Sequence, residues 1–186
     1  MYRRPEDPMN LSILGRELKR RRDVRKTRLK PPATPAPLTE KAAHKAYDQI
    51  LNQLVKPAIL GNRSTYGSDL ERVAIKMIGS QFKGVFPSDK IPRLNALKPY
   101  AILNLDRSDQ SGSHWIAIAF SNGKTYVYDS FGRKSSRIIP TLTHGRGIVD
   151  SDYDAEQDVL EENCGPRSLA WLLFFNAMGA KNAILI

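Results

Sequence analysis

The sequence is poor in the residue types on which most metal and redox chemistry depends. Its 186 residues include one cysteine and three histidines, and these do not recur at the spacing of a zinc-binding motif. A lone cysteine excludes a disulfide within the chain and is typical of proteins that work where thiols stay reduced. We therefore expect no metal site and a location inside a cell or a virion.

Long apolar runs and glycine-rich phosphate loops are missing as well. No segment approaches the ~20 apolar residues of a membrane-spanning helix, and the N-terminus lacks the apolar core of a signal peptide. No glycine-rich motif of the nucleotide-binding kind is present. We expect a protein that is not secreted, does not cross a membrane and uses no cofactor.

Positive charge is concentrated at the N-terminus. Residues 1–30 hold eleven Lys or Arg against four acids, which accounts for seven of the ten net positive charges. Such a block binds polyanions through counterion release, so we predict DNA binding, although a solvated tail or a nuclear localisation signal has the same composition. The predicted DNA contacts are Arg16, Lys19, Arg20, Arg21, Arg22, Arg25, Lys26, Arg28 and Lys30.

Four prolines between positions 31 and 37 follow this basic arm. Proline cannot sustain a helix interior, and Pro-rich segments are extended spacers. We predict a basic arm over residues 1–30, a linker over 31–37 and one domain over 38–186, present as a monomer.

Apolar residues within the domain follow helical and strand periods in turn. Three- and four-residue steps predict amphipathic helices after Thr39 and after Ser68, the second with a capping box from Ser68 to Glu71. Apolar strands are expected near 100–105, 115–120 and 125–129, and a helix that is apolar almost all round near 165–178. The expected fold class is α+β, a small mostly antiparallel sheet packed against helices.

Asn122-Gly123 lies between two of the expected strands and indicates a tight hairpin turn. A tight hairpin brings His114, before one strand, close to Asp129, after the other. A carboxylate bound to one imidazole nitrogen leaves the other nitrogen free to accept a proton. Either residue alone is as easily explained as a strand end or a turn cap.

Cys164 directly precedes the apolar helix. Unpaired backbone N–H groups at a helix N-terminus favour a thiolate, although a lone cysteine is more often a small buried apolar residue. Gln157, seven positions earlier, is a candidate amide donor to an oxyanion, together with the backbone N–H of Cys164.

These residues and their order resemble a known family. The order His114, Asp129, Gln157, Cys164 and the strings GSHWIAIAF, YVYDSFG and ENCGPRSLAWL are similar to the adenovirus-type maturation proteases (adenain), relatives of the ubiquitin-like-protein proteases. The resemblance covers about residues 60–180. It implies the adenain fold, with His114 as general base, Asp129 as its orienting acid, Gln157 as oxyanion donor and Cys164 as nucleophile at the start of a buried helix.

The chain departs from the adenoviral pattern in three respects. Asp129 stands where adenovirus enzymes carry Glu, as in the ubiquitin-like-protein proteases. Only 22 residues follow Cys164 in the 186-residue chain, whereas the adenoviral enzyme has a long segment there. That enzyme tethers its peptide cofactor to a second cysteine, which this chain lacks, so any DNA or peptide activator is expected to bind non-covalently.

The resemblance implies a cysteine endopeptidase that cleaves viral structural precursors during virion maturation, after Gly or other small residues. It would work in the virion interior and in the cytoplasm or nucleus of the host cell. The small size and the basic arm suggest a virophage or a Maverick/Polinton-type element, such as the Mavirus type. Two alternatives remain open: a deubiquitinase-like or deSUMOylase-like isopeptidase, and a DNA-binding packaging protein without activity. His144 is a rival general base.

Overall fold

The computed structural model describes residues 36–142 and 147–186. The basic arm over residues 1–30, the linker as far as residue 35, and His144 lie outside the described residues, so the interpretations placed on them stay predictions. At the start of the described chain, the Leu38 backbone N–H donates to Asn182 Oδ1 over 2.8 Å, and Asn182 Nδ2 donates to the Ala36 carbonyl over 3.3 Å.

Five strands form one sheet in chain order. They are β1 (Phe82–Pro87), β2 (Tyr100–Asn104), β3 (Trp115–Ser121), β4 (Lys124–Tyr128) and β5 (Ile148–Asp150). The two inner pairs, β2 with β3 and β3 with β4, are antiparallel, whereas β1 pairs with β2 and β4 with β5 in parallel. The sheet is therefore mixed, which corrects the expectation of a mostly antiparallel one.

The sequence pattern missed the two outer strands because each is a poor strand by local criteria. β1 is interrupted at Gly84, which has φ +139° and lies at a shift in the pairing register, and it ends at Pro87. β5 has only three residues. Both are edge strands that exist through pairing with a neighbour, and both pair in parallel.

Helices pack around the sheet and on one another. They are α2 (Glu40–Leu54), α3 (Gly67–Ile78), α4 (Ser135–Ile138), α5 (Cys164–Met178) and α6 (Ala180–Ala183), with a 3₁₀ turn η1 (Gly79–Gln81) after α3. Thr39 caps α2, its hydroxyl accepting from the Ala42 N–H. The predicted capping box at Ser68 is wrong: α3 begins at Gly67 after Tyr66 without a side-chain cap, so Ser68 is already inside the first turn.

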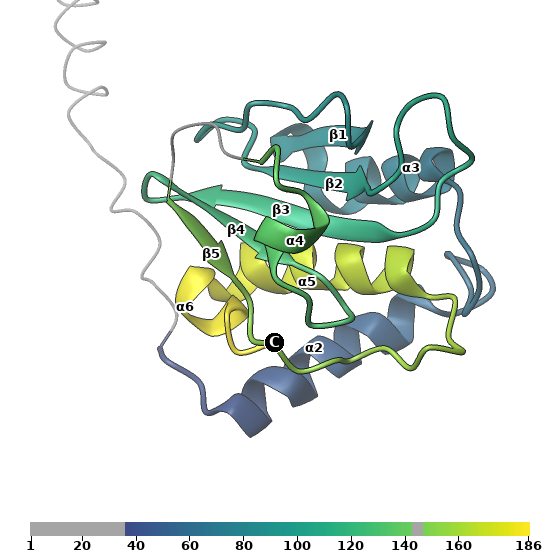
Figure 1. Ribbon diagram of the computed structural model, residues 1–186. Coiled ribbons are helices and arrows are strands. Elements are labelled where there is room, and N and C mark those ends of the chain that lie inside the picture. The colour runs from purple at the N-terminus through teal and green to yellow at the C-terminus, as the bar shows by residue number, and fades with distance from the viewer. Residues whose placement is uncertain (1–35, 143–146) are drawn as a thin grey trace, which may run out of the picture. The chain divides into compact units, whose positions relative to one another are not determined.

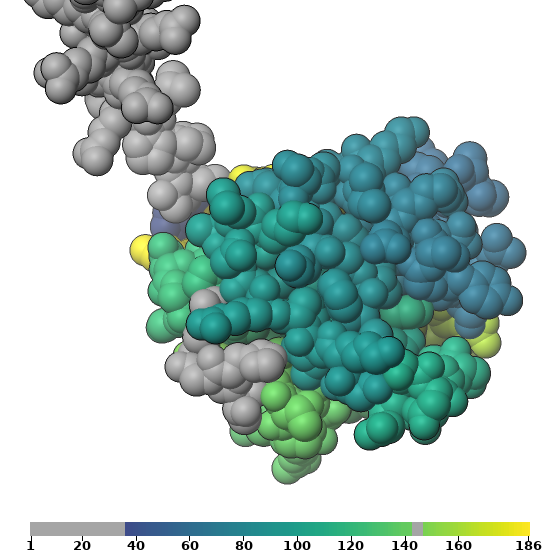
Figure 2. Space-filling model, turned by 90° about the horizontal axis from the view of Figure 1, so that it is seen from above, coloured from purple at the N-terminus to yellow at the C-terminus, as the bar shows by residue number. Residues whose placement is uncertain are grey.

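Alternating strand residues divide between two cores. Tyr100 and Ile102 of β2 and Tyr128 of β4 face α5, and their neighbours Ala101 and Leu103 face a smaller core on the other side. Figure 1 shows α5 lying against the sheet, with α2 beyond it. Figure 2 shows the molecule from above the view of Figure 1; α3, β1 and the segment after β1 (blue to teal) form most of the surface seen there.

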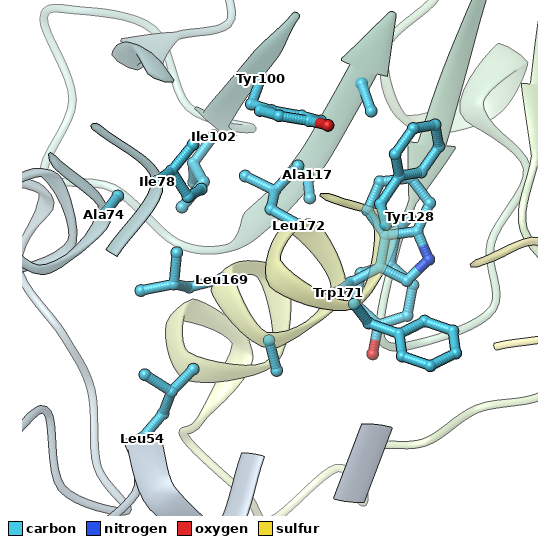
Figure 3. Close-up of a cluster of buried hydrophobic side chains, with 14 of the residues drawn as sticks. Leu54, Ala74, Ile78, Tyr100, Ile102, Ala117, Tyr128, Leu169, Trp171 and Leu172 are labelled. Atoms are coloured by element: carbon cyan, nitrogen blue, oxygen red, sulfur yellow. The ribbon is translucent and has the colours of Figure 1, made fainter. Parts of the chain in front are cut away.

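Helix α5 is buried on nearly every side. Its first turns pack against α2, α3 and the sheet together, as Leu169 and Leu172 show in Figure 3. Trp171 stacks on Tyr128 with ring centroids 5.5 Å apart, and its indole N–H donates to the Ala183 carbonyl over 2.9 Å. The first residue of α5 therefore sits on a rigid support.

Within the described residues, no helix is long and apolar enough to cross a membrane.

Truncation of this support should be costly. We expect Leu169→Ala to lower the free energy of unfolding by about 2–5 kcal/mol, because Leu169 is fully buried and its removal leaves a cavity. Denaturant unfolding measures the change. The matched control is Ile75→Ala on α3, where the side chain is 55% exposed and the loss should stay below about 1 kcal/mol. Equal losses in the two variants would contradict the packing described.

Candidate active site

The turn between β3 and β4 brings His114 to Asp129. Asn122 and Gly123 have φ of +48° and +76°, as a tight hairpin turn requires. Pairing of Ala117 with Tyr128 then sets the ends of the two strands side by side. His114 Nε2 lies 2.6 Å from Asp129 Oδ1, so the contact expected from the hairpin is present.

Asp129 is held as a buried carboxylate by more than this histidine. Arg133 Nε donates to its Oδ2 over 2.6 Å, and the Phe131 backbone N–H donates to its Oδ1 over 3.3 Å. Burial raises the pKa of Asp129, but the hydrogen bonds and charges of His114 and Arg133 outweigh it and hold the pKa below its ordinary value. Sequence reasoning missed Arg133; its position four residues after the acid was the available signal.

The imidazole of His114 is fixed in orientation. Phe131 stacks on the ring with centroids 4.8 Å apart, and Asp129 takes up Nε2. Nδ1 is thus the nitrogen left for Cys164. Burial lowers the pKa of His114, but hydrogen bonds and charge from Asp129 and Cys164 outweigh burial, so the net pKa is raised. The arrangement favours a protonated histidine once Cys164 is ionised.

Cys164 is the first residue of α5. Burial raises the pKa of its thiol, but the interaction with His114 and the backbone N–H groups of Trp115 and Gly165 outweigh burial and lower the pKa overall. A lowered pKa increases the thiolate fraction near neutral pH, and the thiolate is the reactive form. The geometry and the electrostatics therefore suit nucleophilic chemistry at this sulfur.

Gln157 is held beside the loop that carries Asp129. Its backbone N–H donates to the Ser130 carbonyl over 3.0 Å, and its Oε1 accepts from the Ser130 hydroxyl over 2.7 Å. Nε2 donates to the Glu161 carbonyl. Among the described residues, Nε2 has no other hydrogen-bond partner, so its second N–H is available to a ligand. The sequence pattern contained no sign that Ser130 and Glu161 would fix this amide.

The segment just before Cys164 is held by a hydrogen-bond network that sequence reasoning also missed. Asn163 Nδ2 donates to Asn62 Oδ1 over 2.7 Å, and Asn163 Oδ1 accepts from Arg167 Nε over 2.8 Å. Arg167 also donates to Glu161 Oε2 over 2.8 Å. The segment that carries Gln157 and the first turn of α5 are thereby tied together.

A hollow of about 440 Å³ adjoins Cys164, between the segment before α3 and the loop before β3. A second hollow of about 380 Å³ shares Asn104, Gly112 and Trp115 with it. Trp115 packs between them, with its indole N–H donating to the Thr65 carbonyl over 3.0 Å. Gly112 has φ +91°, and a Cβ there would come within 2.8 Å of Asn104 Nδ2, so the loop requires glycine.

Comparison with known proteins gives one informative similarity. No family model matches the chain. The chain is 39% identical over 72 residues to the protease of Frog adenovirus 1 (strain ATCC VR-896). These residues make up 37% of this chain, and the match spans about a third, 35%, of that protease. The similarity supports a viral protease, and therefore a hydrolase.

The lowered pKa of Cys164 leads to a prediction that is independent of any substrate. Because a thiolate forms above the thiol pKa, the midpoint of the rate of alkylation by iodoacetamide should lie at a lower pH than for an ordinary cysteine. His114→Ala removes an interaction that lowers the thiol pKa, so the midpoint should move to higher pH. Mass spectrometry of the alkylated protein at a series of pH values measures it.

His144→Ala is the matched control, because it removes the rival base. The assignment of His114 requires the His144→Ala profile to follow that of the unchanged protein. A shift in the His144→Ala profile with none in His114→Ala would reverse the assignment.

Proposed function

We propose that the chain is a cysteine endopeptidase of the adenovirus maturation type that cleaves viral structural precursors. The carrying observation is the buried His114–Asp129 hydrogen bond of 2.6 Å, together with the lowered pKa of the Cys164 thiol that interacts with the same imidazole. A nucleophile, a base and a group that orients the base, each in hydrogen-bonding reach of the next, define this kind of site.

Cleavage begins with transfer of the Cys164 proton to Nδ1 of His114. The thiolate attacks the carbonyl carbon of the scissile peptide bond and forms a tetrahedral intermediate. The imidazolium, stabilised by Asp129, then gives its proton to the leaving amine, and a thioester remains on the sulfur. Water activated by His114 hydrolyses the thioester and restores the enzyme. Arg133 acts as a positioning residue that keeps Asp129 ionised and in place.

The oxyanion of each tetrahedral intermediate needs hydrogen-bond donors. Gln157 Nε2 and the backbone N–H of Cys164 fill this role in the proposed mechanism. Support comes from the hydrogen bonds to Ser130 and Glu161 that hold the buried amide of Gln157 before substrate arrives. Preorganised donors of this kind cost no reorganisation during the reaction, which is why they are effective.

The substrate and the setting follow from the resemblance. Adenovirus-type enzymes process structural precursors after Gly or other small residues, and we propose the same for this chain, acting as a monomer in the virion and the host cell. The hollow beside Cys164 has the size to accept a few residues of an extended peptide. The basic arm is proposed to hold the enzyme on packaged DNA through Lys and Arg contacts to phosphates. The virophage or Polinton-type origin stays a prediction.

The test is cleavage of the structural precursor encoded with the protease, followed by gel electrophoresis. Cys164→Ala and His114→Ala should abolish processing, since each removes a group that takes part in bond formation or proton transfer. The control is His144→Ala, which should process the precursor at the normal rate. Processing at the normal rate by Cys164→Ala would exclude the mechanism.

The same assay separates the alternatives. A short Gly-containing peptide and a ubiquitin-like modifier fused to a reporter are offered side by side. Preference for the peptide supports the endopeptidase, and cleavage confined to the fused modifier indicates an isopeptidase. Absence of cleavage from both substrates and the precursor, with DNA binding retained, indicates a packaging protein.

Removal of the oxyanion donor should act mainly on the chemical step. We expect Gln157→Ala to lower kcat by about 10²–10³ with a smaller effect on KM, the usual effect of losing one such donor. Steady-state kinetics on the peptide substrate measure both constants. Asp158→Asn, an exposed neighbour, is the control and should leave both near their starting values. An unchanged kcat in Gln157→Ala would assign the oxyanion to other donors.

A further inference from the structure

A second group of functional side chains lies outside the proposed catalytic residues. His44 belongs to α2, and Asp152 and Glu156 belong to the segment between β5 and α5. His44 Nε2 lies 3.9 Å from Asp152 Oδ2, and one ligand atom from each of the three side chains lies within 4.8 Å of the others. An imidazole and two carboxylates thus converge from segments far apart in the chain.

Glu156 is the unexplained member of this group. Both of its carboxylate oxygens are buried, and neither has a hydrogen-bond partner among the described residues. The Tyr128 hydroxyl pairs with that of Tyr47 at 2.7 Å, and Arg167 donates to Asn163 and Glu161. Burial raises the pKa of Glu156 to about 7 and outweighs Tyr128 and Arg167, which lie close enough to lower it. Burial makes the charged form of this carboxylate costly, and a cation bound beside it would offset that cost.

We propose that His44, Asp152 and Glu156 bind a zinc ion, with water as the fourth ligand. Imidazole nitrogen and carboxylate oxygen are zinc ligands, whereas Ca²⁺ and Mg²⁺ prefer oxygen alone. Tetrahedral zinc with bonds of about 2.0–2.1 Å places its ligand atoms about 3.3 Å apart. The His44 and Asp152 atoms, now 3.9 Å apart, need only a small approach, and both side chains are partly exposed and free to adjust.

The ion would fasten the segment before α5 to the surface of α2. Glu156 immediately precedes Gln157, so the zinc site would also restrict movement of that amide; this consequence rests on the proposed function, while zinc binding itself does not. Sequence spacing concealed the site, because His44 is more than a hundred positions away from the two acids. The expected absence of a metal site rests on the spacing of ligands along the chain, which does not reveal ligands that only the fold brings together.

The experiment titrates the full chain with Zn²⁺ in competition with a chromophoric chelator. All proteins carry Cys164→Ala, which removes the thiol as a competing zinc ligand. We expect one zinc ion per chain, and a loss of affinity of at least about tenfold in His44→Ala and in Glu156→Gln, since each removes one of three protein ligands. His144→Ala and Asp154→Asn are the controls, and each should stay within about fivefold of its parent.

A second readout guards against misfolding of a variant. Zn²⁺ should raise the Tm of the parent and of both controls, because the ion binds the folded state, but not that of His44→Ala. His44 is partly exposed on a helix, so its replacement should leave the circular dichroism spectrum unchanged. Absence of zinc binding by the parent, or zinc affinities in His44→Ala and Glu156→Gln that equal the parent's, would overturn the proposal. Since every protein here lacks Cys164, neither result bears on the proposed protease activity.

Discussion

Burial of α5 on nearly every side is the constraint on which the rest of the structure depends. The helix packs between the sheet and α2, and its first residue is Cys164. The Ser168 hydroxyl donates to the Trp115 carbonyl over 3.0 Å, which ties the helix to the residue beside His114. The sulfur and the imidazole are therefore held by the same core, and their relation does not rely on a mobile loop.

Charge then alternates along a short line of side chains. The Arg133 guanidinium hydrogen-bonds to the Asp129 carboxylate. The carboxylate hydrogen-bonds to His114, which interacts in turn with Cys164. Each charge in this partly buried line has an opposite neighbour, and these neighbours produce the three pKa shifts against the effect of burial. Arg133 is 41% exposed at the side chain and brings the line out to solvent.

The segment between β5 and α5 links the two proposed sites. It contributes Gln157 to the first and Asp152 and Glu156 to the second, and Arg167 binds its far end through Glu161. The segment is rich in acids, a composition typical of a solvated loop. In the fold, Glu156 and Gln157 turn inward, where their polar atoms need partners, so this segment decides how far the proposed oxyanion donor is preorganised.

The sequence by itself determined the features that depend on neighbours along the chain: the Asn122-Gly123 turn, the apolar helix after Cys164 and the hairpin contact between His114 and Asp129. The two parallel edge strands, the clamp by Arg133 and the meeting of His44 with Glu156 were decided only by tertiary structure. A turn or an apolar helical stripe follows from the φ preferences and periodicity of adjacent residues, so it can be predicted from them. A contact between distant segments depends on how the whole core packs, and the local sequence pattern does not predict it.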